Sequence, residues 1–290
     1  MDCKLTVIDY SVSELGESPV WDHRKNCFYW LDVLKGKVFS YQEGHKPQLR
    51  IQLPYSIGAL ALCDDINILL LATERGLAFY DLQQSKSKKI CDPEQGLSEN
   101  RFNDAKCDAQ GRFWAGTMAK NGRGTEGHLY CLKGDQRIKT KLSNINCSNG
   151  LAWSEDKMYY IDTGQGGIDE FDYDPLSGNI SNRRRLFSLK VEEGLLDGMS
   201  MDQDGLLWVA LWGAGAVIAV DPAKAEEVDR ISLPVSQITS CTFGGKDLST
   251  LFITTASIGI KQKEEPLAGH VFTYQMPNKG QQTHFYKLAR

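Results

Sequence analysis

The sequence predicts an all-β protein, a six-bladed β-propeller that forms one closed ring and one domain over residues 1–290. One pattern occurs six times along the chain: an apolar residue, a polar turn, then an aromatic or aliphatic run. The apolar residues recur 42 to 48 residues apart, at Trp21, Cys63, Cys107, Trp153, Met201 and Phe243. A period of about 40–50 residues with several short strands per unit is typical of propeller blades.

The strands within each repeat follow from the positions of the turns. Clusters of Asp, Asn and Gly between short β-rich runs predict hairpin turns. After each opening residue they predict a second strand, over residues 27–31, 68–71, 113–114, 158–161, 206–209 and 251–253. Most repeats then offer a third strand, over residues 38–41, 77–80, 129–132, 217–220 and 271–274. The turn of the second repeat, Tyr55–Asp81, is the least regular of the six.

The ring is expected to close with strands from both ends of the chain. We expect the N-terminal strand Lys4–Tyr10 to complete the last blade by pairing with the C-terminal strand Thr283–Leu288. Closure of this kind leaves no long unpaired sheet edge at the seam.

Composition and charge restrict the classes of partner. The net charge is −4, and the lysine-rich run 85–89 and the basic cluster 183–185 lack aromatic neighbours, so we expect solvated turn tips and no nucleic-acid partner. No apolar stretch reaches the roughly 18–20 residues that span a bilayer, and no secretory signal is recognisable, so a cytoplasmic location without a membrane is expected. The eight cysteines form no C-x-x-C pair, which indicates buried thiols. No obligate protein partner is evident.

The position four residues before each opening residue is predicted to form a site. It holds, in order, Glu17, Ala59, Asn103, Asn149, Asp197 and Thr239. Side chains at one phase of a closed repeat point to one place, so two carboxylates and two amides are expected to meet on the axis. The alternative is that Asn149-Gly150 and Asp197-Gly198 only make turns. Carboxylates crowded on an axis repel each other unless an ion or protons compensate, which favours the site.

An oxygen-only ligand set with two negative charges suits one hard divalent cation. Calcium is the expected ion, with zinc, manganese or magnesium as alternatives. Ligands contributed singly by different blades leave positions open for water and substrate, which makes a catalytic ion plausible. Arg101 precedes Asn103 by two residues and is expected to reach the same opening.

Six segments resemble one known family. They are Gly16-Glu-Ser-Pro-Val-Trp, Asn100-Arg-Phe-Asn-Asp, Ala115-Gly-Thr-Met-Ala, Ser148-Asn-Gly-Leu-Ala-Trp, Asp197-Gly-Met and Cys241-Thr-Phe-Gly-Gly. They resemble, in order over nearly the whole chain, the regucalcin/gluconolactonase family, also called senescence marker proteins, which includes luciferin-regenerating enzymes. The resemblance implies a six-bladed propeller with one axial divalent ion.

The resemblance also implies roles for individual residues. Glu17, Asn149 and Asp197 would bind the metal, and Arg101 and Asn103 would contact the substrate.

A carboxylate from the loop after Ala119 would contact the substrate as well. In residues 120–127 that carboxylate can only be Glu126, and the loop is shorter and less acidic than in the animal members that it resembles. The alternative is an ordinary exposed turn.

The reaction implied by the resemblance is hydrolysis of a sugar lactone. Asp197 is the candidate catalytic residue, as acceptor of a proton from water, and Asp104 is expected to fix the orientation of the ligands. Two alternatives stay open: a non-enzymatic calcium-binding regulator, and a different hydrolase that acts on phosphotriesters or a luciferin-related substrate. Fold resemblance does not choose between them, because one scaffold hosts many chemistries.

Overall fold

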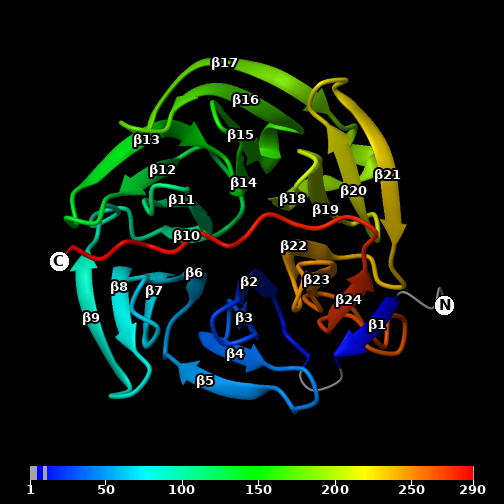
Figure 1. Ribbon diagram of the computed structural model, residues 1–290, viewed down its shortest axis with the longest axis horizontal. Helices are drawn as coiled ribbons and strands as arrows, with labels where there is room; N and C mark the ends of the chain where they lie inside the picture. The colour runs from blue at the N-terminus through cyan, green and yellow to red at the C-terminus, as the bar shows by residue number, and fades with distance from the viewer. Residues whose placement is uncertain (1–4, 9–11, 290) are drawn as a thin grey trace.

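The computed structural model describes residues 5–8 and 12–289. Within this part of the chain, 24 strands form six antiparallel sheets of four strands each. The sheets follow one another around a central axis, as Figure 1 shows. The prediction of an all-β, six-bladed propeller is therefore confirmed.

The first three blades are continuous stretches of chain that run from the axis to the rim. Blade one contains β2 (Gly16–Asp22), β3 (Cys27–Asp32), β4 (Lys37–Tyr41) and β5 (Gln48–Gln52). Blade two contains β6 (Ile57–Leu62), β7 (Ile68–Thr73), β8 (Gly76–Asp81) and β9 (Lys86–Cys91). Blade three contains β10 (Asn100–Cys107), β11 (Phe113–Ala119), β12 (Gly127–Leu132) and β13 (Ile138–Ile145).

The remaining blades keep the same plan, and the sixth takes its outer strand from the N-terminal end. Blade four contains β14 (Ser148–Trp153), β15 (Lys157–Asp162), β16 (Gly167–Asp174) and β17 (Asn179–Ser188). Blade five contains β18 (Leu195–Met201), β19 (Leu207–Trp212), β20 (Ala216–Asp221) and β21 (Glu226–Ser232). Blade six contains β22 (Ile238–Gly244), β23 (Thr250–Thr255), β24 (Val271–Gln275) and β1 (Leu5–Ile8).

Two short 3₁₀ helices, η1 (Thr163–Gln165) and η2 (Val191–Glu193), lie in connections. Within residues 5–8 and 12–289, the search for a helix long and apolar enough to cross a membrane finds none.

The seam of the ring confirms one half of the prediction and corrects the other. The N-terminal strand completes the last blade, but it pairs with β24, with Leu5 opposite Tyr274 and Ile8 opposite Val271. The expected partner, Thr283–Leu288, was wrong. Of the expected strand, Lys4, Asp9 and Tyr10 lie outside the described residues.

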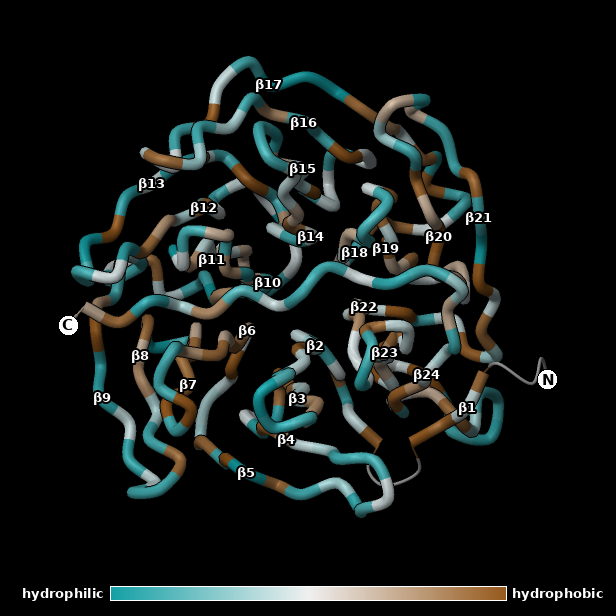
Figure 2. The backbone as a smooth tube through the Cα atoms, viewed as in Figure 1, coloured by the Kyte–Doolittle hydropathy of each residue, from teal (hydrophilic) through white to brown (hydrophobic). Residues whose placement is uncertain are grey.

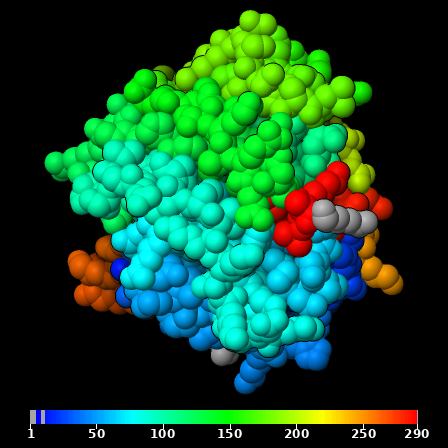
Figure 3. Space-filling view, turned by 90° about the vertical axis from the view of Figure 1, so that its left-hand side faces the viewer, coloured from blue at the N-terminus to red at the C-terminus, as the bar shows by residue number. Residues whose placement is uncertain are grey.

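The C-terminal segment instead crosses one face of the ring, as the red chain in Figure 1 shows. Figure 3 views the disc from the side and shows the red atoms gathered at one face. Gln281 donates its backbone N–H to Met201 at 3.2 Å, and Tyr286 donates to Leu62 at 2.8 Å. Tyr286 is fully buried among residues of blades two and three. The segment therefore braces blades that are not neighbours in the ring.

Burial decreases from the axis to the rim, and Figure 2 shows teal, hydrophilic stretches along the outer strands. Strands β3, β6 and β14 are buried at every position, because both faces pack against neighbouring blades. Strands β9, β17 and β21 are mostly exposed. The basic runs 85–89 and 183–185 lie largely on β9 and β17, so they belong to outer strands and not to the predicted turn tips. Charges on an outer edge discourage pairing with another chain.

Candidate functional site

Every innermost strand has a register shift at the same place, and the predicted site residues lie there. The shifts fall between Glu17 and Val20, Ile57 and Ala59, Phe102 and Ala105, Asn149 and Leu151, Leu196 and Met199, and Ile238 and Ser240. A β-bulge bends its strand and redirects a side chain. Six bulges in phase therefore turn one side chain per blade away from the regular pleat at the axis.

The structure brings together five of the predicted residues. Glu17 comes from β2, Arg101 and Asn103 from β10, Asn149 from β14 and Asp197 from β18. Glu17, Asn149 and Asp197 are buried, with 8%, 3% and 7% of their surface exposed. Strands from blades one, three, four and five thus supply one axial cluster.

A chain of hydrogen bonds joins the amide residues of this cluster. Arg101 Nη1 donates to Asn103 Oδ1 at 2.7 Å, and Asn103 Nδ2 donates to Asn149 Oδ1 at 3.0 Å. Asn149 Nδ2 donates to Thr163 Oγ1 at 2.7 Å, and Thr163 Oγ1 donates to the Leu196 carbonyl at 2.9 Å. Since the Thr163 hydroxyl gives its proton to Leu196, it can only accept from Asn149. This arrangement holds the oxygen of Asn149 on the side away from Thr163.

Burial and mutual repulsion disfavour negative charge on both axial carboxylates. Burial and the nearby Asp104 carboxylate raise the pKa of Glu17 to about 8, against the opposing effects of Ser18 N–H and Arg101. Burial, then Glu17 and Asp104, raise the pKa of Asp197 well above its usual range. Burial lowers the pKa of the Arg101 guanidinium, and the nearby acidic groups oppose this effect. Arg101, together with Lys106 beside Asp104, does not fully compensate three buried acids.

The residues present fit a hard divalent cation. Across the described ranges, no three His, Cys, Asp or Glu side chains gather as a metal-binding group. The axial set instead combines the carboxylates of Glu17 and Asp197 with the amide oxygen of Asn149, which are oxygen donors that calcium accepts. A dication among them would offset the burial and the mutual repulsion that raise both pKa values.

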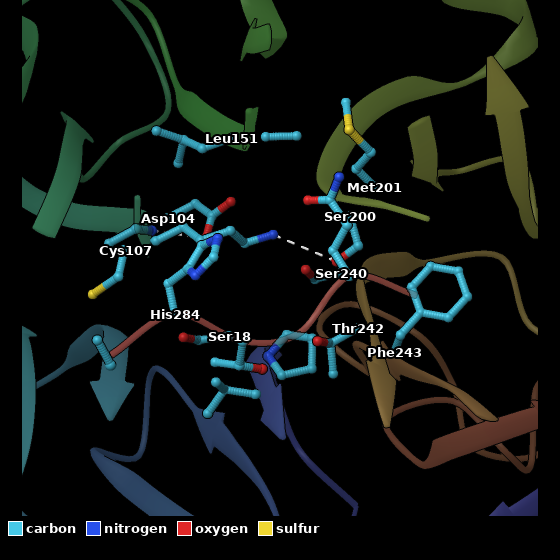
Figure 4. A pocket seen from close by; sticks show the side chains of 18 of the residues that line it. Ser18, Asp104, Cys107, Leu151, Ser200, Met201, Ser240, Thr242, Phe243 and His284 are labelled. Carbon is cyan, nitrogen blue, oxygen red and sulfur yellow. Dashed lines mark hydrogen bonds between the residues drawn. The ribbon is translucent and has the colours of Figure 1, made fainter. Parts of the chain in front are cut away.

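Asp104 and Lys106 occupy the axis beyond this cluster, toward the C-terminal segment. A cavity of about 90 Å³ lies there, and Figure 4 shows Asp104, Ser200 and Ser240 around it, with His284 from the C-terminal segment. Asp104 Oδ1 accepts from Ala105 N–H at 2.7 Å, and its negative charge adds to the effect of burial in raising the pKa of Glu17 and of Asp197.

Lys106 enters the same cavity. Its ammonium donates to the Met199 carbonyl and contacts Ser200 Oγ at 3.4 Å. Burial lowers its pKa, and Asp104 opposes that shift.

The structure does not place Glu126 in the cluster. Glu126 lies in the loop between β11 and β12, called here the lid loop (residues 120–126), and it is exposed. Its carboxylate lies against Gly124, where an added Cβ would come within 2.1 Å of Glu126 Oε2. The lid loop is nevertheless at the site end of blade three, because Ala119 pairs with Asn100, next to Arg101.

Three residues near the site were missed from the sequence. Thr163 follows a strand and has no distinctive motif. Lys106 had a usable signal, since it is the one cation in the otherwise apolar stretch Ala105–Cys107. Cys147 Sγ lies 3.6 Å from the amide nitrogens of Asn103 and Asn149, and burial raises the pKa of its thiol to about 12.

Comparison with known proteins identifies the family. Residues 15–257 match the family described as SMP-30/gluconolactonase/LRE-like region. The chain belongs to this family. The "Putative sugar lactone lactonase YvrE" of Bacillus subtilis is 37% identical over 273 residues, which cover 92% of this chain and 93% of that protein.

Two solved structures share the fold closely. A luciferin-regenerating enzyme is 31% identical with a TM-score of 0.92, covering 98% of this chain and 99% of its own. A calcium-binding protein, regucalcin, from Agrobacterium tumefaciens is 25% identical with a TM-score of 0.92, covering 97% of each chain. The resemblance inferred from the six sequence segments is confirmed.

Proposed function

We propose that this protein hydrolyses sugar lactones, with one divalent cation, calcium by preference, held at the axis by Glu17, Asn149 and Asp197. The convergence of these buried oxygen donors from three blades carries the proposal. Membership in a gluconolactonase family supports the substrate class. The calcium-binding relative supports the choice of ion.

The side chains around the axis have separate tasks in this proposal. When bound, the cation would polarise the lactone carbonyl and lower the pKa of a water molecule. Asp197 accepts a proton from the attacking water and delivers it to the ring oxygen as the acyl–oxygen bond breaks. Arg101 and Asn103 bind ring hydroxyls, and their mutual hydrogen bond at 2.7 Å limits how far either can turn. The product is the open-chain hydroxy acid.

The site electrostatics support a charged metal ligand set at neutral pH. A dication next to Glu17 and Asp197 favours their ionised forms, whereas without it burial favours protonation. Asp104 is a third acid close to Glu17 and Asp197, and it forms a hydrogen bond to neither of them. Cation binding and deprotonation of the axial acids are therefore coupled.

The decisive experiment is a substrate panel measured with and without metal. Protein stripped of divalent ions is assayed on aldonolactones, a phosphotriester and a luciferin-related nitrile, before and after adding calcium, zinc, manganese or magnesium. We expect metal-dependent turnover of aldonolactones. Turnover only of another class, or lactone turnover that is the same in stripped protein, would overturn the proposal.

A second candidate is a calcium-binding regulator without physiological turnover, which the regucalcin relative favours. It predicts calcium binding at the same three residues, with no lactone hydrolysis above the buffer rate. The panel separates the two functions. The cytoplasmic location remains a prediction that cell fractionation would check.

A further inference from the structure

A buried carboxylate outside the axial cluster joins three strands of blade three. Glu94 lies in the connection between β9 and β10, and 8% of its surface is exposed. Its Oε1 accepts from Thr117 Oγ1 at 3.0 Å and Tyr130 Oη at 2.7 Å, and lies 3.2 Å from His128 Nδ1. Its Oε2 accepts from Asn100 Nδ2 at 2.7 Å. Three donors and the His128 ring nitrogen surround one carboxylate and form a buried polar network.

This network reaches the lid loop through one amide. The Nδ2 group of Asn100 also donates to the carbonyl of Glu126 at 2.9 Å, so it joins Glu94 to the last residue of the lid loop. Thr117 accepts from the backbone N–H of His128 at 2.8 Å, which joins the network to the strand that follows the loop. Glu94 therefore fixes the returning end of the lid loop.

The same amide belongs to the strand that carries Arg101. Asn100 is the first residue of β10 and directly precedes Arg101, and its partner across the ladder is Ala119, the last residue before the lid loop. A shift of Asn100 would move both the guanidinium and the loop, because they share this one attachment.

The lid loop is also held at its start by the backbone, where Lys120 N–H donates to the Glu99 carbonyl at 2.7 Å, and by two side-chain contacts. Lys120 Nζ forms an ion pair with Glu74 Oε1 of blade two at 2.7 Å. Asn146 Nδ2 donates to the Gly124 carbonyl at 2.7 Å, and Asn146 is the neighbour of Cys147 at the axial cluster. Both contacts are exposed and contribute little by themselves. The Glu94 network adds a buried carboxylate to these attachments of the loop.

We propose that Glu94 is a positioning residue for the lactone reaction, which sets the placement of Arg101 and of the lid loop together through Asn100. This inference rests on the proposed function. Glu94 touches neither the predicted metal ligands nor the predicted substrate residues. Glu94 affects substrate binding and not metal binding, because the three predicted metal ligands lie on other blades.

The test compares Glu94→Gln with the control Asp92→Asn. Asp92 lies in the same connection and pairs at the surface with Lys89, so its substitution makes the same chemical change without touching the network. In Glu94→Gln, an amide NH₂ replaces one acceptor oxygen and cannot accept from Asn100. Asn100→Ala removes the link itself and serves if Glu94→Gln does not fold.

Two measurements are made on the full chain, backbone hydrogen exchange of residues 120–127 and steady-state kinetics with calcium. We expect Glu94→Gln and Asn100→Ala to speed exchange in the lid loop about tenfold. We expect kcat/KM to fall about tenfold, mainly through KM, with calcium affinity unchanged. Asp92→Asn should match the wild type in both measurements.

A merely structural role would lower thermal stability and leave loop exchange and KM as in the wild type, and that result would overturn the proposal. Loss of calcium affinity in Glu94→Gln would also overturn it, since the effect would then reach the whole ring. Hydrogen exchange needs no turnover. If the wild type proved inactive on lactones, the proposed function would fail while the attachment of the lid loop by Glu94 could still be tested.

Discussion

Replacing Thr163 by valine tests whether the orientation of Asn149 matters for cation binding. Valine keeps the shape of threonine but removes the hydroxyl that accepts from Asn149 Nδ2 and donates to the Leu196 carbonyl. Without it, the hydrogen bond from Asn103 Nδ2 to Asn149 Oδ1 at 3.0 Å is the remaining link in this chain that opposes turning the NH₂ group to the axis. Once turned, Asn149 would present a donor where a cation needs an oxygen.

The expected magnitude follows from these contacts. The two part-buried hydrogen bonds of Thr163 contribute about 0.5–1.5 kcal/mol each. Loss of a partner that orients a metal ligand typically weakens metal affinity about 10–100-fold, or roughly 1.4–2.7 kcal/mol. We therefore expect Thr163→Val to raise the Kd for calcium about 10–100-fold in a calorimetric titration.

Thr73→Val is the matched control. Thr73 also makes two hydrogen bonds, to the Gly76 carbonyl and from the Arg75 N–H, but it is buried where Thr163 is half-buried, and it lies in blade two, which supplies no predicted ligand. Thr73→Val should lose at least as much thermal stability as Thr163→Val, because its site is the more buried of the two, and it should bind calcium as the wild type does. A Thr163→Val protein that binds calcium within about twofold of the wild type would refute the reasoning.

Four further changes have defined outcomes. Asp197→Ala should lower kcat by at least about 100-fold with nearly unchanged thermal stability, and near-full metal-dependent activity would contradict its role. In metal-free protein, the pKa of Glu17 is raised from 4.5 to about 8, so its contribution to stability is complete below pH 4.5 and is lost as pH rises to 8. The Tm of metal-free protein should therefore fall over that range relative to Glu17→Gln, and excess calcium should abolish this fall in the wild-type protein; parallel Tm curves of the two metal-free proteins would argue against the raised pKa. Glu126→Gln should change kcat/KM by less than about twofold, since its exposed carboxylate lies against Gly124, and a larger loss would restore it as a substrate contact. Tyr286→Ala should cost about 3–5 kcal/mol in chemical unfolding, because it empties a fully buried site in the bracing segment, and an unchanged unfolding midpoint would exclude that brace.

The sixfold repeat made the fold predictable, and the wrong partner predicted for the N-terminal strand has a physical cause. Hairpins are local, so turn residues and β-rich runs were enough to predict the three inner strands of most blades. The partner of the N-terminal strand was not local. Val271–Gln275 and Thr283–Leu288 both offer a β-like run, and only the closed ring shows that β24 presents the free edge. The second segment is instead held by contacts to Leu62 and Met201 across the ring.

The sequence by itself determined the number of blades and the chemistry of the axial position. A repeat of constant phase brings Glu17, Asn149 and Asp197 to one axis whatever the details of packing. Only the tertiary structure decided which way the Asn149 amide faces, that Lys106 enters the axial cavity, and that Glu94 holds the lid loop. These depend on contacts between side chains distant in sequence, whose geometry is set by the bulges and by the closure of the ring, and no periodicity records them.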